Sequence, residues 1–287
     1  MKTLRSADGT TIAFDRSGSG QPIIFVPGAM NDHTRCEPLA AALATDHTAV
    51  TYDRRARGES GDTKPYTVDR EVEDLAAVID EVGGQAVVFG YSSGGILALK
   101  AAAEGVKISH LVIFEAPFAL GGMPPTRADL PGKLAELVAR DEPGDAIALF
   151  QSDVIGLPAA VTAQARQSPM WPALEAMAQS VVYDTTLTAQ LGAPTPGMAA
   201  VDVPTLVATG AETWPALRAS AEAMAALLPH GRFEAIEGGA DHDIPVAATA
   251  AAIRAFARGS RVRAAISWRG WPRKFASSYN TQPVTSI

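Results

Sequence analysis

The sequence predicts an α/β fold with a mostly parallel, eight-stranded sheet and helices on both of its faces. Short β-rich runs alternate along the chain with Ala-rich helical stretches, an alternation typical of such a sheet. The alternation stops from about Phe118 to Val201, where prolines are frequent and no convincing strand is present. The 287 residues, 47% of them hydrophobic, fit one large α/β domain or two small ones and supply enough apolar material for a sizeable core.

The eight expected strands are short β-rich runs. They are residues 4–5, 11–15, 23–26, 48–52, 86–89, 111–114, 205–208 and 233–236. The first two are separated by Asp8-Gly9, a dipeptide that favours a hairpin turn.

The clearest helix prediction is residues 68–82, where apolar side chains recur at three- and four-residue spacing. The residues of this face are Val72, Leu75, Ala76, Ile79 and Val82. Further helices are expected at residues 94–104, 216–228 and 245–257.

Residues 118–201 are expected to form a helical insertion, with pieces such as residues 133–140, between core segments 1–117 and 202–258. An insertion at the carboxyl edge of the sheet can cover a site there and supply a substrate pocket. Six apolar residues suggest that this pocket is mostly apolar, with core packing as the alternative for each of them. They are Phe118, Met123, Leu130, Phe150, Met170 and Trp171.

Charge divides the chain into an acidic body and a basic tail. The net charge is −7, yet residues 259–287 alone hold +5, which leaves −12 for residues 1–258. The acidic balance argues against nucleic acid as the main partner, because phosphate contacts need clustered Lys and Arg. The tail is either a poorly ordered or non-native extension or a basic, Trp-containing docking segment.

The N-terminal sequence MKTLRSADGTTIAF has no apolar stretch of the length expected for a signal peptide, and no apolar run reaches the roughly 18–20 residues of a membrane span. The single cysteine, Cys36, excludes an intrachain disulfide. We therefore expect a cytoplasmic protein without a membrane partner. Cys36 is expected either to be buried or, near a helix N-terminus, to have a lowered thiol pKa.

The stretch FGYSSGG predicts a nucleophilic serine at a turn from a strand to a helix. Such a turn is sharp and strained, so the residues two before and two after the nucleophile need little or no side chain. Ser92 has Gly90 and Gly94 at these positions, whereas Ser93 has Tyr91 and Gly95, and the tyrosine should clash. Ser92 is therefore the candidate nucleophile.

A nucleophilic serine needs a base, and His242 is the candidate among five histidines. His47, His110 and His230 precede strands and should lie at the wrong edge of the sheet. His33 follows a strand but belongs to the loop assigned to oxyanion stabilisation. His242 follows the last strand and precedes the last helix, which places it at the edge where Ser92 should lie.

Two backbone N–H groups are expected to stabilise an oxyanion. One is that of Ser93, at the N-terminus of the helix after the nucleophile. The other is that of Ala29, with Met30 as second choice, because Gly28 in IIFVPGAM lets the backbone approach a substrate closely.

Residues 1–258 resemble the α/β-hydrolase-fold superfamily through the ordered segments VPGAM, TYDRRARGESG, GYSSGG, VPTLVATG and GGADHD. The resemblance implies an α/β-hydrolase fold with a helical lid and a triad in the order nucleophile, acid, histidine. Many members have His-Gly in the oxyanion loop, where this chain has Pro27-Gly28, which removes a side chain but not the backbone donors. Asp53 and Arg57 are expected to organise their loop by ion pairing and backbone hydrogen bonds.

The acid departs from the usual pattern of the superfamily. Its customary place, three residues past the glycine of VPTLVATG, holds Thr213, which cannot act as a carboxylate. Glu115, after the strand 111–114, is the favoured replacement, because some members resemble this arrangement. Glu212 is the alternative acid. Asp241 and Asp243 are too close to His242 in sequence to reach its far nitrogen easily.

The expected function is hydrolysis of a small ester, lactone or thioester, with an apolar acyl compound as substrate and no metal or organic cofactor. Hydrolysis of C–C bonds can use the same triad and stays open. A lyase, a cyclase or a binding protein of the same fold also stays open, as does an interaction protein that uses the basic tail. The sequence does not determine the oligomeric state.

Overall fold

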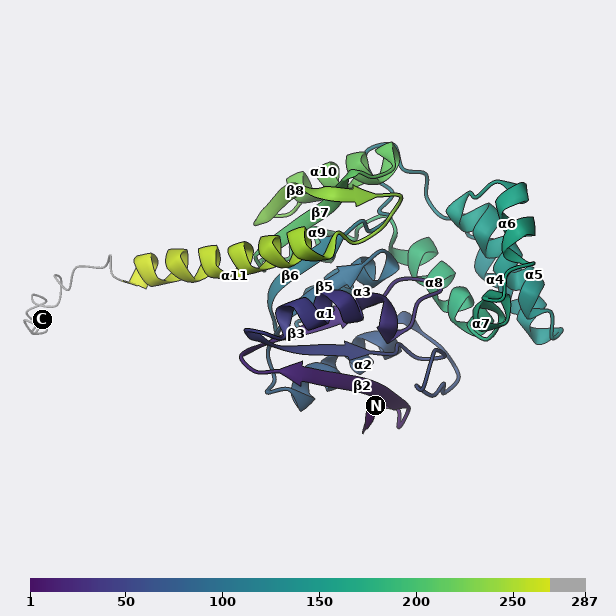
Figure 1. Ribbon diagram of the computed structural model, residues 1–287, viewed down its shortest axis with the longest axis horizontal. Helices are drawn as coiled ribbons and strands as arrows, with labels where there is room; N and C mark the ends of the chain where they lie inside the picture. Colours follow the sequence, from purple (N-terminus) through teal and green to yellow (C-terminus); the bar gives the residue numbers. More distant parts are fainter. Residues whose placement is uncertain (269–287) are drawn as a thin grey trace, which may run out of the picture.

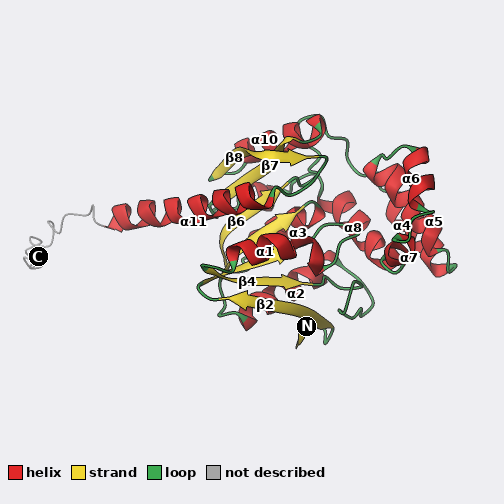
Figure 2. Ribbon diagram, viewed as in Figure 1, coloured by secondary structure: helices red, strands yellow, loops and turns green. Residues whose placement is uncertain are grey.

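The eight predicted strands form one sheet in the order β1-β2-β4-β3-β5-β6-β7-β8 (Figures 1 and 2). The structure is a computed structural model that describes residues 1–268, with side chains up to Arg258. The strand bounds are β1 Lys2–Arg5, β2 Thr11–Gly18, β3 Gln21–Val26, β4 His47–Tyr52, β5 Ala86–Tyr91, β6 Ile108–Phe114, β7 Thr205–Glu212 and β8 Gly231–Ala240. The pairs β1–β2 and β2–β4 are antiparallel and the other five are parallel, which confirms the predicted fold class.

The last two strands are longer than the sequence predicted. β7 and β8 stay paired up to Glu212 and Ala240, beyond the apolar runs that end at Ala208 and Ile236. The extension contains glycines that interrupt the apolar pattern but permit close approach of the two backbones. A Cβ atom on Gly210, for example, would lie 2.5 Å from a backbone oxygen of β8.

Helices cover both faces of the sheet. One face packs against α1 (Glu37–Leu43) and α11 (Val246–Trp268), in a cluster that includes Leu39, Phe89 and Ile253. The other face packs against α2 (Val68–Glu81), α3 (Ser93–Ala103) and α10 (Pro215–Leu227). Successive strand residues alternate between the two clusters, as the period of a β-strand requires.

The segment between β6 and β7 is helical and lies to one side of the sheet (Figure 1). Its helices are α4 Leu130–Ala139, α5 Pro143–Leu149, the π-helix Phe150–Ile155, α6 Ala159–Ala165, α7 Trp171–Glu175, α8 Ala178–Leu191 and α9 Pro196–Ala199. We call α4 to α8 the lid helices; they share a hydrophobic cluster of their own. The second half of α8 and all of α9 pack instead into the core beneath the sheet, through Leu187, Leu191 and Met198. Helix α8 therefore connects the lid with the core.

Helix α11 corrects one boundary of the prediction. The sequence predicts a helix that ends at Ala257 and a tail that begins at residue 259, but the backbone stays helical to Trp268 and projects from the sheet (Figure 1). Gly259 does not end the helix, because one glycine costs a helix only about 1 kcal/mol. The rest of the predicted tail, residues 269–287, lies outside the described residues. Across the described chain, no helix is both long and apolar enough to cross a membrane.

The turn from β5 to α3 brings three backbone segments into contact. Ser92 adopts φ 53° and ψ −126°, in the region that L-residues rarely occupy. A Cβ atom on Gly90 would lie 2.6 Å from the Gly94 oxygen, and one on Gly94 would lie 2.3 Å from the Val26 oxygen. The two glycines are thus required by backbone packing, as the sequence pattern predicted.

We expect Gly94→Ala to lower the free energy of unfolding by about 1–3 kcal/mol, because the added methyl group meets a backbone oxygen that cannot rotate away. Gly132→Ala is the matched control, since a Cβ atom on this helical glycine would meet nothing within 4 Å. It should leave stability unchanged or raise it by roughly 0.5–1 kcal/mol. Urea denaturation measures both variants, and equal stabilities would contradict the packing argument.

Candidate active site

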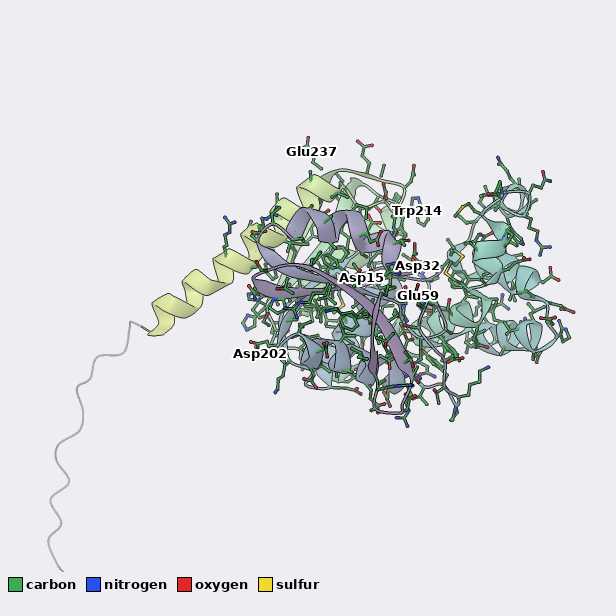
Figure 3. The ribbon with its side chains drawn as sticks, turned by 60° about the horizontal axis from the view of Figure 1, so that its bottom comes forward. Asp15, Asp32, Glu59, Asp202, Trp214 and Glu237 are labelled. Atoms are coloured by element: carbon green, nitrogen blue, oxygen red, sulfur yellow. The ribbon has the colours of Figure 1, made fainter. Side chains whose placement is uncertain are left out.

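Ser92 lines a cavity of about 490 Å³ between the carboxyl edge of the sheet and the lid helices. His242 lines the same cavity, as does Ala29 from the loop after β3. Trp214, which precedes α10, stands on the side of the core that faces the lid (Figure 3). The strand ends predicted to meet at this edge therefore do meet there.

His242 is bound to Glu115 through its Nδ1 atom. The distance from Nδ1 to Glu115 Oε2 is 2.5 Å, and the carboxylate is 1% exposed. The other oxygen, Oε1, accepts the backbone N–H of Gly210 at 2.8 Å. Both oxygens of Glu115 are therefore engaged, which fixes the carboxylate against the imidazole and satisfies a charge that would be costly to bury unpaired.

Glu115 reaches the histidine across an intervening strand. It follows β6 and has φ 50°, whereas His242 follows β8, and β7 with Gly210 lies between the two. The left-handed backbone at Glu115 turns the chain directly after the strand, and its N–H remains bound to the Ala208 oxygen. The favoured acid of the sequence analysis thus lies beside the predicted base.

The other candidate acids do not bind this nitrogen. Glu212 is exposed at the end of β7, and Nδ1 of His242 is already occupied by Glu115. The hydroxyl of Thr213, at the customary position, has no hydrogen-bond partner among the described residues. Asp243 pairs with Arg35, and Asp241 is an exposed residue of the cavity wall.

Two aromatic rings stack on the imidazole of His242. The centroid of Tyr91 lies 4.9 Å away and that of Trp214 5.7 Å away, with interplanar angles of 28° and 22°. The Tyr91 hydroxyl donates to the His242 carbonyl at 2.6 Å, and Arg35 donates to the same oxygen at 3.2 Å. The ring and the backbone of the histidine are thus both held in place. Aromatic faces also favour a positive charge on the imidazole.

The two expected oxyanion donors are available. Neither the N–H of Ala29 nor that of Ser93 has an acceptor among the described residues. Ser93 is the first residue of α3, where the helix dipole adds to the field of its N–H. A Cβ atom on Gly28 would lie 2.7 Å from the Cβ of Ser92, so this loop lies directly against the nucleophile turn.

A buried cluster of charges lies beneath the oxyanion loop. Arg54 forms a two-point pair with Glu71 and donates to Asp184 at 2.8 Å, and Arg57 donates to Asp184 at 2.7 Å. All four side chains are at most 2% exposed. Burial alone would raise the pKa of Asp184, but Arg57, Arg54 and a hydrogen bond from Ser93 outweigh it and lower that pKa. Asp184 therefore stays ionised.

Asp53 and Arg57 both organise the loop after β4, but each has separate partners. Asp53 accepts from the backbone N–H groups of His33 and Glu59 and contacts the His33 ring. Arg57 binds the carbonyls of Gly28 and Asn31 and the carboxylate of Asp184. The expected ion pairing of Arg57 is thus made with a lid helix rather than within its own loop.

The remaining histidines lie away from the cavity. His47 begins β4, His110 lies early in β6 and His230 directly precedes β8, all towards the opposite edge of the sheet. In the described part of the chain, His33 belongs to the two clusters with a spacing suited to a metal ion. They are Asp15-His33-Glu37 and Asp32-His33-Asp53, and no member of either lines the cavity.

The apolar lid residues divide into two groups. Met123 and Phe150 line the cavity, together with Val154, Ile155 and Leu157, which the sequence analysis did not single out. The other four residues predicted to line it do not. Phe118, Leu130 and Trp171 are buried in packing, and Met170 is 66% exposed. The helical period identified apolar faces, but only the folded lid shows which of them meet the cavity.

Five residues of the site were missed by sequence reasoning. Asp184 and Trp214 lie in segments without a motif, and Arg35 lies in a short 3₁₀ helix, His33–Cys36, where only His33 and Cys36 were noted. Tyr91 was treated as an obstacle beside Ser93, although its position next to the nucleophile placed it at the site. Arg54 belongs to the recognised segment TYDRRARGESG, but nothing in that segment indicates a partner 130 positions away.

Comparison with known proteins agrees with this architecture. Residues 23–275 match the alpha/beta hydrolase family. An alpha/beta hydrolase from Sphaerobacter thermophilus DSM 20745 is 42% identical, with a TM-score of 0.82 over 89% of this chain and 99% of that one. A thermophilic esterase from Thermogutta terrifontis is 23% identical, with a TM-score of 0.67 over 90% of this chain and 99% of that one. This second similarity is one of fold.

Among curated proteins, the hydrolase YraK of Bacillus subtilis (strain 168) is 30% identical over 116 residues, 39% of this chain and 43% of that protein. The matches to the first curated relatives span less than half of their lengths.

Cys36 is buried rather than reactive. Its side chain is fully buried, and burial, only partly opposed by Arg35, raises the pKa of the thiol to about 12.

We expect iodoacetamide at pH 8 to leave the native protein unmodified, because the thiol stays protonated and covered. Unfolded in guanidinium, the chain should take up one adduct, since an exposed thiol has a pKa of about 8.5. Rapid alkylation of the native protein would contradict this expectation. Intact mass spectrometry counts the adducts on the native and the unfolded protein.

Proposed function

We propose that this chain, which belongs to the alpha/beta hydrolase family, is a serine hydrolase that cleaves a small carboxylic ester, lactone or thioester through an acyl-enzyme on Ser92. One observation supports this above all: His242, which is bound to Glu115, and the strained Ser92 turn line the same cavity. A nucleophile, a base and an oriented carboxylate are the groups that acyl transfer needs.

Acylation begins when Ser92 Oγ attacks the carbonyl carbon of the substrate. His242 Nε2 takes the serine proton as the new C–O bond forms, because Nδ1 is held by Glu115. The carbonyl oxygen becomes negatively charged and accepts the N–H groups of Ala29 and Ser93. The bond to the leaving group then breaks, and the imidazolium returns its proton to the departing alkoxide or thiolate.

Deacylation repeats these steps with water as the nucleophile. His242 removes a proton from water, the hydroxide attacks the acyl carbon, and the bond to Ser92 Oγ breaks as the imidazolium reprotonates the serine. The imidazolium formed in both halves is stabilised by the Glu115 carboxylate and by the faces of Tyr91 and Trp214. The cycle consumes one water and requires no metal or organic cofactor.

The lining of the cavity favours an apolar acyl compound. Met123, Phe150, Val154, Ile155 and Leu157 from the lid surround it, and its volume of about 490 Å³ suits a small substrate. The proposed partner is therefore a small molecule rather than a nucleic acid or a membrane. We also propose that the protein is cytoplasmic.

The first test is covalent labelling with a serine-reactive fluorophosphonate. We expect one adduct per wild-type chain, because His242 activates Ser92 and the N–H groups of Ala29 and Ser93 donate to the phosphonyl oxygen. The variant Ser92→Ala should gain no adduct, and intact mass spectrometry measures both. The neighbouring hydroxyl provides a control for the site of labelling, since Ser93→Ala keeps Ser92 and should still reach one adduct at completion, although the loss of its contact with Asp184 slows the reaction.

An adduct that persists in Ser92→Ala would contradict the assignment of the nucleophile. No adduct on the wild type, together with no turnover of p-nitrophenyl esters, lactones or thioesters, would contradict hydrolysis of this substrate class and favour a non-hydrolytic role.

Glu115→Gln should lower kcat for p-nitrophenyl acetate by about 10²–10⁴-fold, because the amide neither stabilises the imidazolium nor fixes its tautomer. Glu212→Gln is the matched control, the same change on the exposed candidate, and should stay within about twofold of wild type, as expected away from a site's special features. Steady-state kinetics decides between them. Equal activities in the two variants would overturn the assignment of Glu115.

A further inference from the structure

Asp184 lies on lid helix α8 yet contacts the machinery around both oxyanion donors. Its Oδ2 accepts from Arg57 Nη2 at 2.7 Å. Its Oδ1 accepts from the Ser93 hydroxyl at 2.7 Å and from Arg54 Nη1 at 2.8 Å. The carboxylate is 1% exposed, so these contacts take place away from bulk water, where electrostatic interactions are strong.

Arg57 connects Asp184 to the peptide unit that carries the Ala29 N–H. Its Nη1 donates to the carbonyl oxygen of Gly28 at 2.5 Å and to that of Asn31 at 3.1 Å. The Gly28 carbonyl and the Ala29 N–H belong to one planar peptide unit, in which the two groups point in opposite directions. Holding that carbonyl therefore aims the N–H at the other side of the loop. Arg54 adds a third contact, to the carbonyl of Pro27 at 3.2 Å.

The Ser93 side of the oxyanion hole is held more directly. The Ser93 hydroxyl donates to Asp184, and the Ser93 backbone N–H opens helix α3 as the second proposed donor. One carboxylate thus restrains the residue that supplies one donor and, through Arg57, the peptide that supplies the other. One donor lies on the loop after β3 and the other at the start of helix α3, and the Asp184 carboxylate is the group common to both.

We propose that Asp184 is a positioning residue that aligns the Ala29 and Ser93 N–H groups and makes this alignment depend on the docking of the lid helix α8. The inference rests on the proposed function, in which these groups bind the oxyanion. Asp184 holds no proton in the reaction and touches no reacting atom. Its effect is on the rate of the step in which negative charge develops on the substrate oxygen.

A second anchor of α8 provides a matched control. The neighbouring residue, Tyr183, stacks on Tyr66 with centroids 3.7 Å apart and donates its hydroxyl to Asp62 at 2.8 Å. Asp62→Asn therefore weakens a contact between lid and core through the same chemical change as Asp184→Asn. Asp62 makes no contact with Arg57, Gly28 or Ser93 among the described hydrogen bonds, so the oxyanion loop should be unaffected.

The experiment combines steady-state kinetics with hydrogen–deuterium exchange of the full chain. For Asp184→Asn we expect kcat for p-nitrophenyl acetate to fall about 10- to 100-fold, somewhat less than the loss of a whole oxyanion donor, with KM within about threefold. Exchange should accelerate in peptides covering residues 27–36, where the N–H groups of His33, Thr34 and Arg35 are hydrogen-bonded. Asp62→Asn should change kcat less than about twofold and leave that exchange as in wild type.

Wild-type kcat, or unchanged exchange of residues 27–36 in Asp184→Asn, would overturn the proposal. So would equal effects of the two variants, because these would indicate a general role of lid docking. Should Asp184→Asn not fold, Arg57→Lys decides, since lysine keeps the charge but lacks the planar fork that reaches Gly28 and Asp184 together. The same kinetic and exchange pattern in Arg57→Lys supports the proposal, and wild-type behaviour overturns it.

A wild-type chain without turnover would contradict the proposed function by itself. The exchange of residues 27–36 needs no activity, so it would still show whether Asp184 orders the oxyanion loop.

Discussion

The left-handed backbone of Ser92 is the constraint on which the rest of the site depends. A residue with φ 53° between a strand and a helix persists only when its surroundings determine it fully. Here Gly90, Gly94 and Gly28 allow the helix, the strand and the oxyanion loop to approach within distances that a side chain would prevent. The same close approach brings Ala29 and Ser93, whose N–H groups have no acceptor among the described residues, to the cavity that Ser92 lines. The strained backbone of Ser92 and the availability of the Ala29 and Ser93 N–H groups therefore have a common cause, which is the close packing of these backbone segments.

Around this turn, buried hydrogen bonds and ion pairs hold the polar side chains in fixed positions. Glu115 crosses β7 to reach His242 and is fixed by the Gly210 N–H, so the histidine needs no acid from the loop after β7. That loop instead supplies Trp214, which stacks on the imidazole. On the other side, two arginines and two carboxylates neutralise one another beneath the oxyanion loop. Removing one member of such a cluster lowers the free energy of unfolding strongly, because the partner charge is left buried and unpaired. The complete cluster therefore holds the oxyanion loop in a fixed position.

Sequence reasoning predicted what depends on local pattern and strand order. The strand–turn–helix context selected Ser92 over Ser93, and the edge at which strands end selected His242. Glu115 was favoured over Glu212 through the resemblance to the α/β-hydrolase fold, and the catalytic roles of all three residues stay predictions. It failed where contacts join distant segments: nothing near Asp184 indicates Arg54 or Arg57, since α8 is a helix without a motif. For the six lid residues it left open whether each lines the cavity or packs in the core, because helical period reveals an apolar face but not what that face meets. The predicted stop near Gly259 was wrong because the weak local preference of one glycine does not decide where a helix ends.

The most direct test of the central claim is a crystal structure of the phosphonylated protein. The account predicts phosphorus bonded to Ser92 Oγ and one phosphonyl oxygen about 3 Å from the N–H groups of both Ala29 and Ser93. The Glu115–His242 contact should be retained, with Nε2 facing Ser92. Phosphorus on another residue, or a phosphonyl oxygen directed away from both amides, would contradict the claim that these segments form one site for acyl transfer.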